Sequence, residues 1–123
     1  MDQRAPLALY QILDAIKHFR IVLGSADVAE LAVDLTRRYA AERCIEIISE
    51  ASRRIPDEWK SRHPAIPWSD IAGIRNVLRH NYEEVNLQII VKLRNQPLED
   101  LAAAVSALLN EIDPEGAGFR DPT

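Results

Sequence analysis

The chain has 123 residues, of which 47% are hydrophobic and 28% are charged, and its net charge is −4. This composition is typical of one globular domain and excludes a disordered chain, while apolar runs of only a few residues exclude a membrane-spanning helix. The single cysteine excludes an intrachain disulfide. The first residues lead directly into an amphipathic pattern, so we expect no signal peptide and a cytoplasmic protein.

The charge is unevenly distributed along the chain. Residues 51–94 carry eight Lys/Arg and five Asp/Glu, whereas residues 1–50 carry six and eight, and residues 95–123 carry one and six. A local basic surface on an acidic protein can attract a phosphate backbone. A chance excess of solvated arginines explains the pattern equally well.

The first element is predicted to be an amphipathic helix. Apolar residues recur at three- and four-residue steps from Leu9 to Leu23, and Gly24 marks its end. Ser25 is then expected to cap a second helix, with Asp27 in the first turn, where a carboxylate is favourable to the helix dipole.

The second helix is expected to be long. Its apolar stripe runs from Val28 to Ile55 and stops at Pro56. Cys44 lies in this stripe, which indicates a core residue rather than a reactive thiol. Three prolines and the absence of periodicity then predict a loop over residues 56–67.

A third helix is predicted to begin at Trp68 or Ser69 and to reach about His80. Further helices follow it. Asn86 has the character of an N-cap for a fourth helix, and the flanking Val85 and Ile90 are spaced as a hydrophobic staple. Pro97 is expected to end that helix and to start another, which its apolar positions carry to Ile112.

No window shows the alternation of a strand. The fold class is therefore predicted to be all-α, an antiparallel bundle of four or five helices. We expect one domain over residues 1–113 and a loose tail over residues 114–123, where proline and glycine accumulate.

The most informative motif is Arg75-x4-His80-x-Tyr82 on the third helix. Asn76 and His80 are four residues apart, so the amide can orient the imidazole, and Arg75 and Arg79 form a cationic strip that suits an anion. Arg75 and His80 diverge by about 140° on the helix, with about 7.5 Å of rise between them. A site assembled from two subunits across a two-fold axis would bring such residues into one cleft.

These residue types suit RNA cleavage without a metal ion. Histidine exchanges protons near neutral pH, and arginine binds two phosphate oxygens with a planar fork. Attack by the 2′-hydroxyl would leave a 2′,3′-cyclic phosphate and would spare DNA. An Arg and a His at this spacing also occur on helices by chance.

Two segments extend the motif. Segment 66–76 (IPWSDIAGIRN), closing on His80-x-Tyr82, resembles the signature of the HepT-like family of HEPN ribonucleases, and segment 43–51 (RCIEIISEA) looks like the family's second-helix segment. The departures are Ser49, where a glycine is common, and Asn81-Tyr82-Glu83-Glu84, where a phenylalanine and a glycine usually follow the tyrosine.

The resemblance implies a HEPN helical bundle that forms a homodimer, with both motifs lining a shared cleft. It implies a toxin of a type VII toxin–antitoxin system that cleaves RNA without a metal ion or cofactor. Its antitoxin would be an MntA-like nucleotidyltransferase that transfers AMP from ATP to the motif tyrosine. Carried over to this chain, Arg75 and His80 are the catalytic pair, Asn76 is the polar companion that supports them, and Tyr82 accepts AMP. The cationic strip adds Arg79 as a further supporting residue.

A different class of function stays open: a non-catalytic HEPN module that serves as the accessory subunit of a nucleotidyltransferase. Other residues suggest weaker sites. His18 and His63 with nearby aspartates lack the spacing of metal ligands. Trp59 and Trp68 would stack on a base or, more simply, pack the loop.

Two groups of charged residues have alternative roles as well. Glu46 and Glu50, one helical turn apart, suit a dimer contact or pairing with arginine better than acid–base work. The basic residues around the predicted loop either extend a positive surface toward RNA or are solvated charges; they are Arg53, Arg54, Lys60 and Arg62.

Overall fold

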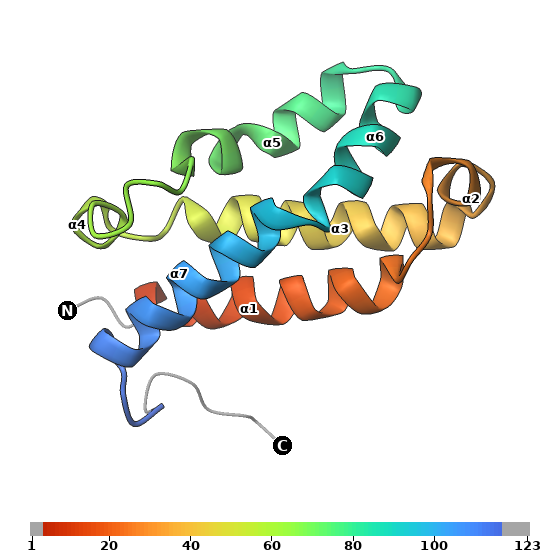
Figure 1. Cartoon of the computed structure of the whole chain (residues 1–123). Coiled ribbons are helices and arrows are strands. Elements are labelled where there is room, and N and C mark those ends of the chain that lie inside the picture. The colour runs from red at the N-terminus through yellow and green to blue at the C-terminus, as the bar shows by residue number, and fades with distance from the viewer. Residues whose placement is uncertain (1–3, 117–123) are drawn as a thin grey trace.

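The computed structural model describes residues 4–116, which form seven helices and no strand (Figure 1). The predicted all-α bundle is therefore confirmed. The helices are α1 (Arg4–Leu23), α2 (Val28–Val33), α3 (Leu35–Ser52), α4 (Asp57–Lys60), α5 (Trp68–His80), α6 (Glu83–Leu93) and α7 (Gln96–Ile112). In this part of the chain, no helix is both long enough and apolar enough to cross a membrane.

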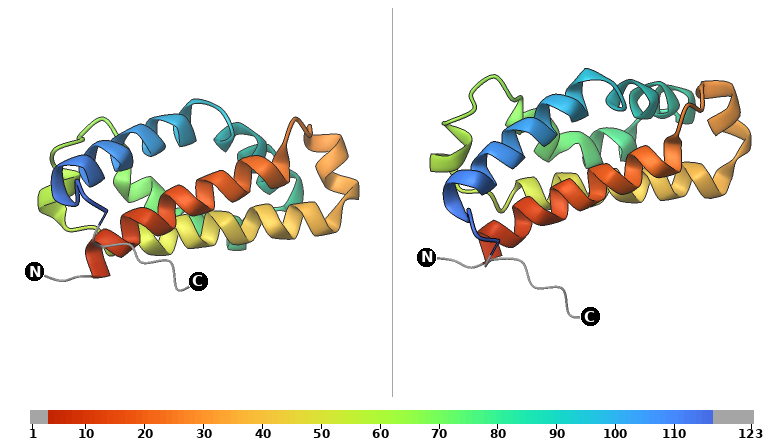
Figure 2. Two further views of the ribbon diagram at one scale, coloured as in Figure 1. Left: turned by 90° about the horizontal axis from the view of Figure 1, so that it is seen from below. Right: turned by 60° about the horizontal axis from the view of Figure 1, so that its bottom comes forward.

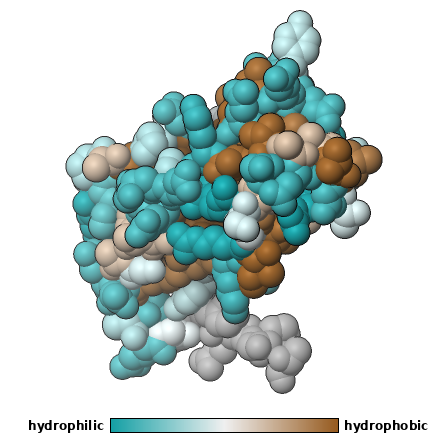
Figure 3. All heavy atoms as spheres, turned by 45° about the vertical axis from the view of Figure 1, so that its right-hand side comes forward, coloured by the Kyte–Doolittle hydropathy of each residue, from teal (hydrophilic) through white to brown (hydrophobic). Residues whose placement is uncertain are grey.

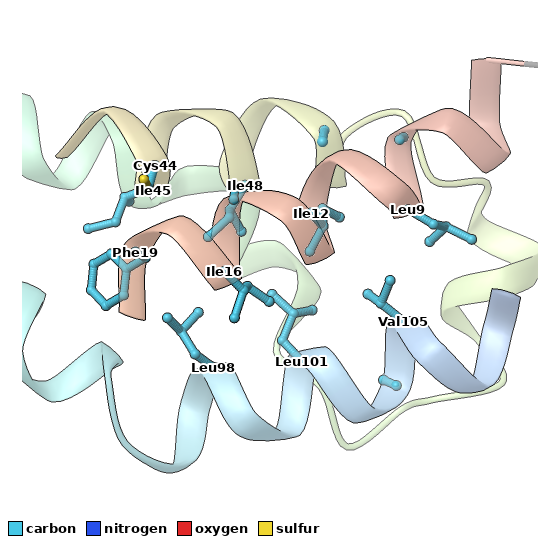
Figure 4. Close-up of a cluster of buried hydrophobic side chains, with 14 of the residues drawn as sticks. Leu9, Ile12, Ile16, Phe19, Cys44, Ile45, Ile48, Leu98, Leu101 and Val105 are labelled. Carbon is cyan, nitrogen blue, oxygen red and sulfur yellow. The ribbon is translucent and has the colours of Figure 1, made fainter. Parts of the chain in front are cut away.

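Helix α1 lies along one side of the bundle (Figure 1). It packs lengthwise against α3 and is crossed on another side by α7, while α5 packs on α3 (Figures 1 and 2). The apolar faces of α1, α3 and α7 meet in one core, in which Ile16, Ile45 and Leu101 are almost fully buried (Figure 4). Each such side chain contributes about 1.5–3 kcal/mol when it leaves water, so this core fixes the framework that carries α5.

The predicted second helix is in fact two helices, α2 and α3, and that prediction was wrong. The break lies at Asp34, whose backbone (φ −112°, ψ 85°) leaves the helical region. Its carboxylate accepts a hydrogen bond from the Arg37 N–H at 3.1 Å and so caps α3. The cap of α2 is Asp27, in a capping box with Glu30, rather than the predicted Ser25.

The predicted loop at 56–67 contains the one-turn helix α4. The side chain of Trp59 is 6% exposed, and the indole N–H of Trp68 donates to the carbonyls of Lys60 and His63 at 3.2 and 3.0 Å. The packing role that we weighed for the two tryptophans is therefore the correct one, and it fixes the point at which α5 begins.

Several predicted boundaries are confirmed. Gly24, with φ +53°, follows the end of α1, helix α5 spans Trp68–His80, and Pro97 lies in the first turn of α7. The predicted cap of the fourth helix was wrong: α6 begins at Glu83 with Tyr82 in the N-cap position. Of the predicted tail, residues 114–116 are exposed, and residues 117–123 lie outside the described part.

Candidate functional site

Helix α5 has two different faces and no fully buried side chain. Ile71, Ile74 and Leu78 are half-buried and pack against the core, because they recur at helical spacing on the side facing α3. The opposite face carries Ser69, Gly73, Asn76, Val77 and His80, and its side chains other than the glycine are exposed. A Cβ added at Gly73 would meet nothing within 4 Å, so this face leaves room for a close approach from outside.

Arg75 points toward α3 rather than toward this exposed face. Its Nε lies 3.9 Å from Oε1 of Glu46, and its Nη1 lies 3.6 Å from Oε2 of Glu50. The two glutamates therefore pair with an arginine, which is one of the two roles we considered for them. Arg75 Nε is buried without a hydrogen-bond partner among the described residues, so these ion pairs leave its donor capacity unused.

Two adjoining hollows flank Arg75, and both also include Arg43 and Glu46. The Arg54 hollow (≈ 240 Å³) is bounded by α1, α3 and α5, and the Tyr39 hollow (≈ 270 Å³) lies between α3 and α5. The Arg54 hollow is lined by Gln11, Arg43, Glu46, Ile47, Glu50, Arg54 and Arg75. The Tyr39 hollow is lined by Tyr39, Glu42, Arg43, Glu46, Arg75, Leu78 and Arg79. Arg75 is thus reachable from two sides.

His80 and Tyr82 lie at the far end of α5, and both are exposed. The Tyr82 side chain is 86% exposed, so it does not pack within this chain. No hydrogen bond joins the side chains of Asn76 and His80 in the described part of the chain, and the support of His80 by Asn76 stays a prediction. His80 does not line either of the two hollows beside Arg75.

The turn between α5 and α6 is held by contacts that the sequence did not reveal. Asn86 Nδ2 donates to the Leu78 carbonyl at 2.6 Å, which satisfies an acceptor in the last turn of α5. Arg38 of α3, whose side chain is 13% exposed, forms an ion pair with Glu83 at the start of α6. These contacts fix the positions of His80 and Tyr82 relative to α3.

Ser49 joins α3 to α5. It is 1% exposed, and its hydroxyl donates to the Ala72 carbonyl at 2.8 Å. Arg53 donates to the same oxygen from Nε at 3.1 Å and from Nη2 at 2.8 Å. Three donors from α3 thus hold the middle of α5, next to Gly73 and close in sequence to Arg75.

The other basic residues that we considered for an RNA surface mostly have partners within the chain. Arg54 donates to Gln11, and Arg62 pairs with Glu58 and Glu111. These contacts favour a structural role for them over a free cationic patch.

Two further features concern possible metal ligands, such as His18 and His63, and the thiol of Cys44. The described residues contain no group of three metal-ligating side chains. Cys44 is buried, and burial raises the pKa of its thiol, as expected for a core residue.

Comparison with known proteins identifies the family. Residues 12–108 match the family model described as "Ribonuclease HepT-like". A protein of Thermococcus cleftensis named "Probable ribonuclease HepT" is 37% identical over 93 residues, which are 76% of this chain and 84% of the relative. A "Putative RNase" of Methanocaldococcus jannaschii is 33% identical over 85 residues, which are 69% of this chain and 78% of the relative.

A "Putative RNase" of Caldanaerobacter subterraneus is 36% identical over 77 residues, which are 63% of this chain and 67% of the relative. No solved structure matches the chain. The family model spans more than half of the chain, so the chain belongs to the HepT-like ribonuclease family, and the predicted resemblance to this family is confirmed.

Proposed function

We propose that this member of the HepT-like ribonuclease family is a metal-independent RNA endonuclease, the toxin of a type VII toxin–antitoxin system in the cytoplasm. The observation that carries the proposal is the placement of Arg75: a half-buried guanidinium with an unused donor, beside two open hollows and on the helix that ends in His80. The catalytic unit is the helical domain of residues 1–113.

In this mechanism Arg75 binds the phosphate to be cleaved. The O2′–P bond forms while the P–O5′ bond breaks, and the products are a 2′,3′-cyclic phosphate and a 5′-hydroxyl. His80 accepts the proton of the 2′-hydroxyl, water protonates the leaving 5′-oxygen, and the imidazolium then returns its proton to the solvent. The guanidinium stabilises the charge that develops on the phosphate, so no metal ion is needed.

A homodimer would bring the imidazole to Arg75. Arg75 faces α3 whereas His80 is exposed at the end of α5, so the phosphate at Arg75 needs a histidine from another chain. The exposed face of α5 suits this contact, because Gly73 leaves open space and Val77, an apolar residue, is 43% exposed. We therefore place the two-fold axis at this face of α5.

Tyr82 is the proposed control point. An MntA-like nucleotidyltransferase would join the tyrosine oxygen to the α-phosphorus of ATP, with loss of the hydroxyl proton and release of pyrophosphate. Tyr82 is 86% exposed, so its hydroxyl can enter the active site of such an enzyme. The added AMP would place an anion and a base near the cations of Arg75 and Arg79 and so block RNA.

The experiment is expression of the chain in cells without a partner, as the wild type and as His80→Ala, with His18→Ala as the matched control. His18 is an exposed histidine on α1, away from α5. We expect growth arrest and RNA degradation with the wild type and His18→Ala, and neither with His80→Ala. Equal effects of all three proteins, or of none, would favour the non-catalytic accessory module.

A further inference from the structure

Tyr39 is an exposed aromatic residue (57%) that, unlike the still more exposed Tyr82, lines a polar hollow. The side of the molecule that carries α2 and α6 is mostly hydrophilic, with separate apolar patches (Figure 3). Tyr39 lies near the start of α3 and shares its hollow with Arg75 and Arg79 of α5. An exposed ring beside the proposed phosphate-binding arginine is the arrangement from which this inference starts.

The ring is held from one side. The guanidinium carbon of Arg38 lies 5.1 Å from the centroid of the Tyr39 ring, within the range of a cation–π contact. Arg38 is itself fixed, because its Nε lies 3.4 Å from Glu42 and its Nη1 pairs with Glu83. With the ring next to a fixed cation, Tyr39 is preorganised, and it is still 57% exposed.

The cations in the Tyr39 hollow differ in how they are engaged. Arg79 makes no ion pair with another described residue. The Arg43 side chain is 70% exposed, and its Nη1 forms a loose ion pair with Oε2 of Glu46 at 3.7 Å. The hollow therefore combines an exposed aromatic ring with three arginines that can bind a phosphate. Its two carboxylates, Glu42 and Glu46, are paired with arginines. Its volume of ≈ 270 Å³ admits a nucleobase but not a folded domain.

We infer that the Tyr39 hollow is a base-binding subsite for single-stranded RNA, in which the base next to the scissile phosphate stacks on Tyr39. This inference rests on the proposed ribonuclease function and names the class of its substrate. Stacking on an aromatic ring needs an unpaired base with a free face, whereas the bases of a duplex are covered by their neighbours. Arg79 would contact the phosphate that follows the stacked base.

The test measures binding rather than cleavage, so it does not depend on the nuclease reaction. The protein carries His80→Ala, which prevents cutting, and the probe is a fluorescently labelled single-stranded oligoribonucleotide of about eight nucleotides. Tyr39→Ala is compared with Tyr39→Phe. The control is Leu35→Ala, which removes an equally prominent residue (51% exposed) one turn earlier on α3, outside the Tyr39 hollow.

Stacking on one aromatic ring predicts a loss of affinity of about 5- to 140-fold in Tyr39→Ala. Tyr39→Phe keeps the ring and should bind within about two-fold of the parent, like Leu35→Ala. A duplex of the same sequence should bind weakly to the parent protein, which carries His80→Ala alone. The Tyr39→Ala variant should bind this duplex with the same weak affinity as the parent. An unchanged affinity for the single strand in Tyr39→Ala, or no binding by the parent, would overturn the subsite.

A second readout follows the ring directly. In Tyr39→Trp, the added indole should be quenched by the single-stranded probe, after subtraction of the parent signal from Trp59 and Trp68. An alternative is that Tyr39 contacts a protein, in which case Tyr39→Ala changes the oligomeric state and leaves the affinity for RNA and the quenching unaffected. Cleavage that proceeds without any dependence on Tyr39 would overturn this subsite and leave the ribonuclease function standing.

Discussion

Arg75 lies between two carboxylates, and this placement has a consequence for its chemistry. The distances to Glu46 and Glu50, 3.9 and 3.6 Å, are those of loose ion pairs rather than hydrogen bonds. A phosphate that enters either hollow can therefore take up the guanidinium fork while the glutamates keep the side chain extended along α3. Glu46 and Glu50 act in this view as positioning residues.

The fork, rather than the charge, should decide activity. We expect Arg75→Lys to lose nearly as much as Arg75→Ala, about 10²–10³-fold in kcat, because an ammonium cannot grip two phosphate oxygens in a fixed plane. Steady-state cleavage of a short RNA by the two variants, each checked for helix content, measures this. A lysine variant with most of the wild-type rate would reduce Arg75 to a point charge.

Tyr82 offers a second prediction at the residue scale. After coexpression with an MntA-like nucleotidyltransferase, intact-mass analysis should show one or more added AMP units, and Tyr82→Phe should show none. Tyr39→Phe is the matched control, because Tyr39 is also exposed and lies on the neighbouring α3. AMP that persists in Tyr82→Phe would place the modification elsewhere, and an unmodified protein held inactive by its partner would indicate inhibition by binding.

At the scale of elements, the turn between α5 and α6 follows His80 and contains Tyr82. Asn86 crosses this turn to the Leu78 carbonyl, and Arg38 reaches Glu83 from α3. Both contacts hold α6 in place after the chain has passed Tyr82. The direction of the exposed His80 and Tyr82 side chains therefore depends on residues outside the motif.

Loss of the Asn86 amide should destabilise this turn. We expect Asn86→Ala to lower the free energy of unfolding by about 1 kcal/mol, because the Leu78 carbonyl loses its side-chain donor. Gln88→Ala, an exposed position on the same helix, should change it by less than about 0.5 kcal/mol. Urea unfolding monitored by circular dichroism compares the two, and equal values would mean that the Asn86 contact contributes nothing to stability.

The sequence predicted those elements whose signals are local. The bounds of α5 follow from its periodicity, the end of α1 from Gly24 and the start of α7 from Pro97. The sequence did not predict the break at Asp34, because the apolar stripe continues through this position. The helix breaks there because the Asp34 carboxylate accepts a hydrogen bond from the backbone of the next helix, which favours a non-helical conformation at Asp34.

Contacts between distant residues set the remaining features. Asn86 resembles an N-cap, but its amide is used for a carbonyl eight residues earlier. Arg38 and Glu83 are 45 residues apart, and no local spacing predicts their pairing. The motif residues of the candidate site could be named from the sequence, whereas the hollows beside Arg75 and the ring of Tyr39 depend on how α3 and α5 pack.

At the scale of the whole molecule, the site is proposed to need two chains. Arg75 faces α3 in one subunit, and His80 would come from the other across the exposed face of α5. Each dimer would then contain two equivalent sites, each with residues of both subunits. Inactive variants with different defects should consequently complement each other.

Mixing Arg75→Ala and His80→Ala subunits tests this arrangement. With random reassociation, half of the dimers are mixed and each mixed dimer has one intact site, so we expect about a quarter of the wild-type activity. Native mass spectrometry verifies that mixed dimers form. Mixed dimers without recovered activity would mean that both residues act from the same subunit.

The central claim is that Arg75 and His80 cleave RNA without a metal ion, and purified protein tests it most directly. A single-stranded RNA is incubated in EDTA with the wild type, His80→Ala and His18→Ala, and the product ends are identified by mass spectrometry. We expect the wild type and His18→Ala to leave 2′,3′-cyclic phosphates, with a loss of about 10²–10⁴-fold in His80→Ala. Cleavage that stops in EDTA and returns with Mg²⁺ or Mn²⁺, or that His80→Ala retains, would contradict the claim.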